Sequence, residues 1–185
     1  MIGVQELKKG TTFEIDGSIY KVLEYEHIKV ARGGATIKIK ARDLRTGSTI
    51  VRSFNNGHRV QDIRLDHATV QYLYHDGDMY TFMDLETYEQ PMLTAEVLGD
   101  AVYYLLPEMT LDIVSYEGKP IDIELPTTVD MEVVYTEPGY AGDTATGATK
   151  EVQFETGLKV NVPLFINQGD VIRVDTRTNS YVTRV

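Results

Sequence analysis

The side chains of this sequence that could do chemistry are mostly cations, and the most distinctive of them stands in a glycine-rich stretch. Residues 29 to 35 read KVARGGA and lie between two strand-like segments. Gly33 and Gly34 tolerate positive φ, so the stretch predicts a tight hairpin tip that holds Arg32 away from the body of the protein. A guanidinium can bridge phosphate or ribose oxygens with several donors at once. Arg32, Gly33 and Gly34 are therefore the candidate functional tip.

Further cations follow the same hairpin. Lys38 and Lys40 share one face of their strand because side chains alternate with a period of two. Near the tip we count a single acid, Asp43, and we therefore expect the arm and its base to form the most basic surface of the protein. The plain alternative is an ordinary solvated hairpin with an idle Arg32. The candidate RNA-binding cations of this region are Lys29, Lys38, Lys40 and Arg42, with Arg45 nearby.

The distribution of charge favours the functional interpretation of the hairpin. The 185 residues carry a formal charge of −10, which by itself argues against a nucleic-acid partner. Residues 1–65, however, hold 12 Lys+Arg against 7 Asp+Glu, whereas residues 66–185 hold 6 against 21. The net charges are therefore +5 and −15, and solvation alone would not separate them by segment.

No constellation for catalysis or metal binding is evident. The histidines are scattered, and a metal needs ligands that converge with defined geometry. Asp76 and Asp78 bracket Gly77 and are typical of a hairpin turn. No serine lies in a Gly-x-Ser-x-Gly elbow, and the absence of cysteine removes disulfides and thiol nucleophiles. We expect a protein without enzymatic activity, cofactor or metal; the four histidines are His27, His58, His67 and His75.

One segment has the glycine spacing of a phosphate-binding loop but lacks its chemistry. Residues 142–147 read GDTATG, and Ala148 stands where the lysine of such a loop belongs. The next segment, 152–154, is typical of a strand, whereas that loop requires a following helix. Two alternatives stay open: a surface loop without a role, or a loop whose backbone amides meet the phosphates or base edges of another molecule.

The elements that must position these residues are mostly strands. Apolar and polar residues alternate with a period of two between turns rich in Gly, Asp and Asn, which predicts an all-β protein. One short helix is expected at 95–98, capped by Thr94 and ended by Gly99. The expected strands are 13–15, 20–25, 36–40, 49–54, 70–74, 79–84, 109–114, 121–125, 131–135, 152–154, 158–162, 171–174 and 180–182.

The chain divides into three modules. The charge changes sign near residues 64–66, and Pro126 separates two strand-like stretches, which predicts domains 1–65, 66–126 and 127–185. Domains of about 60 residues are marginal alone, so we expect them to pack on one another or on a partner. The longest apolar run, 101–106, is far shorter than a membrane span of roughly 20 residues, and we expect a cytoplasmic protein.

Short motifs occur along the whole chain: RGGA at 32–35, LRTG at 44–47, FNNG at 54–57, QYLY at 71–74, FMDLETYEQ at 82–90, ELP at 124–126, GDT at 142–144, VPLF at 162–165 and DTRT at 175–178. In these motifs the chain resembles the bacterial elongation factor P family over essentially its whole length. The resemblance implies an SH3-like (KOW-like) N-terminal barrel and two OB-fold barrels in an L-shaped, tRNA-like arrangement.

The resemblance also implies a function. Members bind the ribosome between the P and E sites and promote peptide-bond formation at polyproline stalls, without making a bond themselves. Their tip residue reaches the CCA end of the P-site peptidyl-tRNA, and here that residue is Arg32. Gly142, Asp143 and Thr144 correspond to a third-domain loop near the E-site codon, and Tyr181 and Arg184 fall near tRNA or ribosomal RNA. A monomer is expected from this site.

The tip departs from the common family pattern. Many members carry Pro-Gly-Lys-Gly and modify the lysine, whereas this chain has Val30, Ala31 and Arg32, so lysine β-lysylation is excluded. Members with a rhamnosylated arginine carry Asn after it, and this chain has Gly33. Arg32 is the possible modification site, and an unmodified arginine is the working hypothesis. The alternatives are a specialised paralogue and an OB-type module that binds single-stranded RNA by aromatic stacking.

Overall fold

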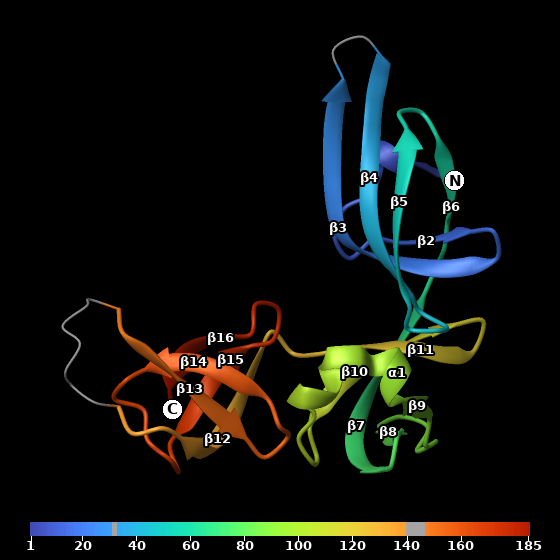
Figure 1. Cartoon of the computed structure of the whole chain (residues 1–185). Helices are drawn as coiled ribbons and strands as arrows, with labels where there is room; N and C mark the ends of the chain where they lie inside the picture. The colour runs from blue at the N-terminus through green and yellow to red at the C-terminus, as the bar shows by residue number, and fades with distance from the viewer. Residues whose placement is uncertain (31–32, 140–146) are drawn as a thin grey trace.

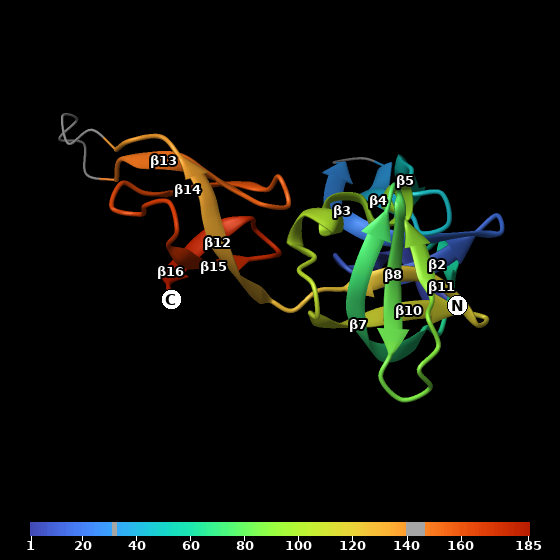
Figure 2. The ribbon, with the colours of Figure 1, turned by 90° about the horizontal axis from the view of Figure 1, so that it is seen from below.

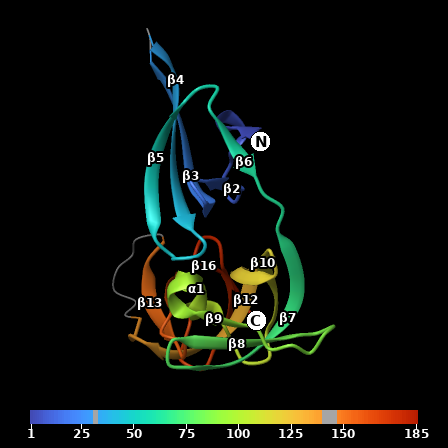
Figure 3. The same cartoon turned by 90° about the vertical axis from the view of Figure 1, so that its right-hand side faces the viewer.

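The computed structural model describes residues 1–30, 33–139 and 147–185. The described chain forms three antiparallel sheets, each built from strands that are consecutive in sequence. The N-terminal domain stands on the middle domain, and the C-terminal domain extends from the middle domain to one side, which gives an L-shaped outline (Figures 1 and 3). The predicted fold class, three small β domains in an L, is confirmed.

The N-terminal domain forms a six-stranded sheet in the order β1-β6-β2-β3-β4-β5. Its core contains Phe13, Ile37 and Ile39, which come from alternating positions of their strands and are fully buried. The period of two thus buries one face of each strand. The elements are β1 (Ile2–Gly3), the 3₁₀ helix η1 (Val4–Glu6), β2 (Thr12–Ile15), β3 (Ser18–Val30), β4 (Gly33–Asp43), β5 (Thr49–Asn55) and β6 (Arg59–Asp62).

The middle domain forms a five-stranded sheet in the order β11-β10-β7-β8-β9. The side-chain oxygen of Thr94 accepts from Val97 N–H at 3.4 Å, so the predicted cap and the helix that Gly99 ends are confirmed. The predicted turn at Gly77 joins β7 to β8. The elements are β7 (Asp66–Asp76), β8 (Met79–Asp84), β9 (Met92–Thr94), α1 (Ala95–Leu98), the 3₁₀ helix η2 (Gly99–Tyr104), β10 (Thr110–Tyr116) and β11 (Lys119–Glu124).

The C-terminal domain repeats a five-stranded arrangement in the order β14-β13-β12-β15-β16. Phe154, Ile166 and Ile172 are buried at its centre. The gaps between the three sheets fall after Asp62 and after Glu124, while the finer boundaries at 65/66 and 126/127 stay predictions. The elements are β12 (Thr128–Thr136), β13 (Thr149–Phe154), β14 (Lys159–Pro163), β15 (Val171–Asp175) and β16 (Ser180–Arg184).

A shared core joins the N-terminal and middle domains. Ile19 and Leu44 of the N-terminal domain pack with Val114 and Ile121 of the middle domain in one buried cluster. Beside it, Lys21 Nζ lies 2.9 Å from a carboxylate oxygen of Asp122. The two small domains therefore complete each other's apolar burial, as their size predicts.

Arg42, on the strand that leads to the predicted tip, forms hydrogen bonds across the junction between these two domains. Its guanidinium donates to the carbonyls of Glu96 at 2.9 Å and Leu98 at 3.4 Å and also to that of Val97, which lie at the end of α1. The last carbonyls of a helix have no partner within the helix, and a cation satisfies them well. A Cβ at Gly99 would lie 2.8 Å from this guanidinium, so the close approach requires glycine.

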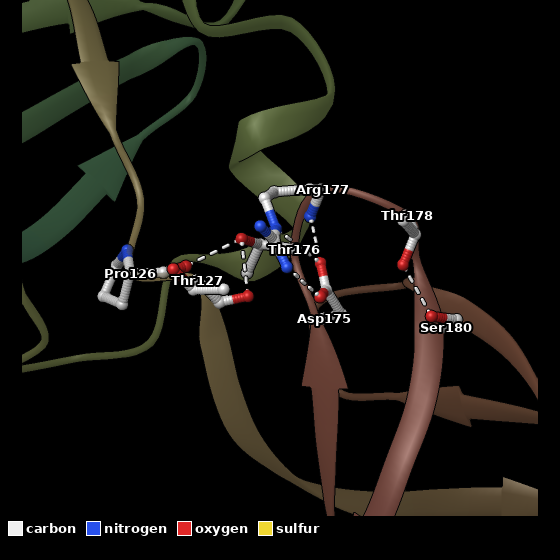
Figure 4. A network of polar contacts seen from close by, with 7 residues as sticks. All are labelled: Pro126, Thr127, Asp175, Thr176, Arg177, Thr178 and Ser180. Atoms are coloured by element: carbon white, nitrogen blue, oxygen red, sulfur yellow. Dashed lines mark hydrogen bonds and ion pairs between the residues drawn. The ribbon is translucent and has the colours of Figure 1, made fainter.

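The C-terminal domain is joined to the middle domain by side chains that enter its core. Tyr104, the last residue of η2, is buried against the C-terminal core, and its hydroxyl donates to Asn179 Oδ1 at 2.9 Å. Thr156 Oγ1 donates to the carbonyl of Tyr103 at 2.6 Å. Thr176 Oγ1 donates at 2.7 Å to the carbonyl of Pro126, at the end of the connecting segment (Figure 4).

The sequence did not predict the shortest strands. β1, β6 and β9 contain two to four residues and, unlike the equally short β2 with Phe13 and Ile15, show too little alternation to predict a strand. Only Val60 is buried in β6, and only Leu93 in β9. Partner strands rather than local pattern define these elements.

The turn after β15 predicts a dependence of stability on acid. The pKa of Asp175 is lowered from 3.8 to about 2, first because Arg177 donates to it from its side chain and then because the Arg177 backbone N–H does so as well (Figure 4). A lowered pKa in the folded state stabilises above pH 3.8, and this contribution is lost as the pH falls toward 2. Urea titrations of D175N should show a smaller loss of unfolding free energy between pH 4 and 2.

R177Q is the matched variant for this measurement. It keeps the carboxylate and the backbone donor, so it should flatten the pH dependence only in part. Wild-type behaviour in both variants would contradict the assigned cause.

A second prediction concerns the angle between the first two domains. R42A should lower the unfolding free energy by about 1–3 kcal/mol, because it leaves helix-end carbonyls without their charged donor. It should also broaden the distance distribution between spin labels on cysteines that replace Asn56 and Glu86, both exposed. The chain has no native cysteine, so only these sites are labelled.

G99A should reproduce the broadening, since its methyl group displaces the Arg42 guanidinium. R59A is the control, because Arg59 donates to the Met1 carbonyl within the N-terminal domain. A narrow, unchanged distribution in R42A would show that Arg42 does not fix the angle.

Candidate nucleic-acid interface

The stem of the predicted arm is a two-stranded extension of the N-terminal sheet. β3 and β4 pair from Tyr20↔Asp43 to Val30↔Gly33, whereas β4 pairs with β5 only as far as Thr36↔Asn55. The last residues of β3 and the first of β4 therefore continue beyond their neighbour and project away from the middle domain (Figures 1 and 3). Val30 and Gly33 form the last pair of this extension that the structure describes.

The predicted tip itself falls largely outside the described residues. Arg32 lies between the described ends of β3 and β4, and the side chain of Lys29 is likewise outside the description. Gly33 is described as the first residue of β4, and Gly34 follows it in the same strand. The role of Arg32, Gly33 and Gly34 stays a prediction.

The base of the arm carries acids that the count from the sequence left out. The register places Glu24 opposite Lys40 and Glu26 opposite Lys38, so two acids face the two lysines across the strands. Lys40 Nζ lies 2.9 Å from Glu24 Oε1, and Lys40 lowers the pKa of this carboxyl. The count of a single nearby acid was wrong, because these glutamates come from the preceding strand.

The remaining predicted cations of the arm lie in different settings. Lys38 is exposed, whereas the guanidinium of Arg42 is directed to the end of α1 in the middle domain. The sequence did not reveal that contact, since the two partners are more than 50 residues apart. RNA binding by Lys29, Lys38, Lys40 and Arg42 stays a prediction, and for Arg42 the structure adds this contact between domains.

The structure describes only some of the predicted RNA-binding residues of the C-terminal domain. Gly142, Asp143 and Thr144 fall outside the described residues. Tyr181 packs partly against the domain core, whereas Arg184 is exposed and its Cζ lies 5.7 Å from the ring centroid of Phe165.

Phe165 is a candidate contact residue that the sequence reasoning missed. Its ring is 57% exposed, and a Cβ at Gly139 would approach the carbonyl of the preceding Leu164 to 2.9 Å. Gly139, the last described residue before residues 140–146, therefore lies against the backbone of the residue that precedes Phe165. The motif VPLF was the available signal, but the sequence does not show that its phenylalanine is exposed.

Two further observations concern metal binding and membrane-spanning helices. Within residues 1–30, 33–139 and 147–185, no three His, Asp or Glu side chains gather closely enough to hold a metal ion. None of the helices in this described part is long and apolar enough to cross a membrane.

Comparison with known protein families covers almost the whole chain. The model of the elongation factor P KOW-like domain matches residues 3–60, that of the elongation factor P OB domain matches 65–123, and that of the elongation factor P C-terminal domain matches 129–184. The three matches follow the order of the three sheets.

Curated relatives match over the full length. The chain is 47% identical over 184 residues to elongation factor P of Moorella thermoacetica and 44% identical over 185 residues to that of Pelotomaculum thermopropionicum, and each match covers 100% of both chains. A solved structure titled eukaryotic translation initiation factor 5A, from Methanococcus jannaschii, aligns with a TM-score of 0.51 and 23% identity. It covers 67% of this chain and 91% of that one, and supports the fold. The chain belongs to the elongation factor P family of translation elongation factors.

Proposed function

We propose that the chain binds the ribosome between the P and E sites and promotes peptide-bond formation at polyproline stalls. Arg32 steadies the CCA end of the P-site peptidyl-tRNA. The observation that supports this role is the projecting stem of β3 and β4, whose ends are joined through Arg32. Because the family consists of translation elongation factors, membership supports a role of the arm in translation elongation.

In the mechanism that we propose, the chain positions the donor tRNA for attack by proline. Proline attacks through a secondary amine, and its ring fixes φ, so few geometries of approach are productive. A guanidinium that holds the donor tRNA reduces the freedom that must be lost before attack. The chain forms no covalent bond, and it acts as a positioning factor rather than as an enzyme.

The distribution of charge suggests how the domains divide the partners. Residues 66–126 contain 13 Asp+Glu and a single basic residue, Lys119, so this domain repels phosphate. We infer that it faces basic ribosomal proteins. Lys29, Lys38 and Lys40 on the arm, and residues 142–144 with Tyr181 and Arg184 in the C-terminal domain, are the proposed RNA contacts. One copy of the chain acts per ribosome in the cytoplasm.

The first test removes the tip cation. R32A should abolish relief of a polyproline stall in a reconstituted translation assay. The unfolding free energy should stay within about 0.5 kcal/mol, because the proposed role requires Arg32 to contact the tRNA rather than the rest of the protein. R64A removes the same unit charge from an exposed position outside the arm and should retain relief.

Equal relief by R32A and wild type would contradict the proposed role of Arg32. Intact mass of the native protein completes the test, because a sugar on Arg32 would add a discrete mass. Salt-dependent binding of free RNA with no preference for ribosomes would instead favour a general RNA-binding module.

A second test maps the partners of the acidic domain. A photoreactive side chain at Glu86 or Glu89, both exposed in the middle domain, should crosslink mainly to ribosomal proteins. The same group at Lys38 on the arm should crosslink mainly to RNA. Predominant crosslinks from the middle domain to ribosomal RNA would contradict the inferred division.

A further inference from the structure

A cleft rich in aromatic side chains lies where the middle and C-terminal domains meet. Its volume is about 680 Å³. One wall comes from β7 and β8, another from η2 and the segment after it, and the third from the turn between β13 and β14. The turn and η2 approach each other in both views of the junction (Figures 1 and 2). The aromatic residues that line it are Tyr72, Tyr74, His75, Tyr80 and Tyr103.

The inner rings of this cleft are fixed before any ligand arrives. The imidazole of His75 stacks on Tyr80 with 4.9 Å between centroids and 17° between planes. The hydroxyl of the buried Tyr72 lies 3.0 Å from His75 Nδ1. The hydrogen bond from Thr156 to the Tyr103 carbonyl, at 2.6 Å, holds the third wall in place. A cleft with fixed walls loses little conformational entropy on binding.

Two of the tyrosines that line the cleft are exposed to solvent. Tyr74 is 57% exposed and Tyr103 is 41% exposed, although both line the cleft. The register between β7 and β8 shifts between Tyr72 and Tyr74, and such a bulge changes the direction of the side chains that follow it. Exposed tyrosines in a concave site offer π faces to a ligand.

The charge around the cleft selects the kind of ligand. Glu155 lines the cleft, and Asp76 and Asp78 are exposed in the turn next to its β7 and β8 wall. Among the described residues that line it, none is lysine or arginine. A phosphate-bearing ligand would therefore meet acids without a compensating cation, whereas a cation would be attracted both by the carboxylates and by the rings.

We propose that this cleft binds an arginine side chain presented by a basic protein segment. The planar guanidinium stacks on Tyr74 or Tyr103 while its N–H groups donate to the carboxylate of Glu155. Arginine fits better than lysine, because a guanidinium can stack and donate at the same time. The site deepens the inferred preference of the acidic domain for basic proteins, yet its occupancy does not depend on the action of Arg32.

The test uses the full chain and a nine-residue peptide, GRGSRGSRG, without ribosomes. The chain has no tryptophan but 12 tyrosines, so tyrosine fluorescence reports binding without locating it, and backbone amide shifts locate the peptide on the chain. The double variant Y74A/Y103A should weaken peptide binding at least tenfold, and E155Q about threefold. The peptide with lysine in place of arginine should bind more weakly to the wild-type chain.

Y88A is the matched control. Tyr88 is 72% exposed in the same acidic domain but lies in the turn after β8, outside the cleft. Its substitution should leave binding unchanged, and equal weakening by Y88A and Y74A/Y103A would overturn the proposal in favour of general electrostatic attraction. Circular dichroism and thermal unfolding of each variant confirm that the fold is kept.

Two competing ligands complete the experiment. Tighter binding of nine-nucleotide oligouridine, or of nonaproline, to the same tyrosines would also overturn the proposal, because neither carries a guanidinium. R32A should bind the arginine peptide as wild type does. A failed stall-relief assay with intact peptide binding would then separate this inference from the proposed function.

Discussion

The contact between Arg42 and the end of α1 ties the strand that leads to the arm to the middle domain. β4 includes both Arg42 and Gly33, and a strand rises roughly 3.3 Å per residue, so nine steps separate the contact from the arm by about 30 Å. A small rotation at Arg42 becomes a large displacement at the other end. The direction of the described stem of β3 and β4 therefore depends on the contact between two domains.

Charge is distributed differently over the stem of β3 and β4 and over the middle domain. Along the stem, the lysines of β4 face the glutamates of β3, so the paired strands avoid the repulsion that a row of like charges would cause. This pairing lowers the net charge of the stem and with it any attraction for phosphate. The acidic middle domain likewise disfavours phosphate around its own surface.

The sequence predicted what depends on local pattern. Alternation of apolar residues predicted the strands, and Thr94 predicted the cap of α1, because each signal lies within a few residues of its effect. The pairing of Glu24 with Lys40 and the contact of Arg42 with Glu96 depend on register and on domain packing. The sequence itself contains Glu24 and Glu26, which the count of acids omitted, but their pairing with the lysines of the next strand depends on register. The aromatic cleft was missed for the same reason, since Tyr74, Tyr103 and Glu155 come together only when two domains meet.

The small size of the domains connects stability with shape. A core of about 60 residues buries too little surface to be strongly stable alone, so Ile19 and Leu44 share a cluster with the middle domain and Tyr104 enters the core of the C-terminal domain. The contacts that complete these cores are the same contacts that set the angles of the L. Loosening an angle would therefore expose apolar surface, and the cost of that exposure keeps the arm in one direction. The angles between the domains are thus held by the same apolar burial that completes the core of each domain.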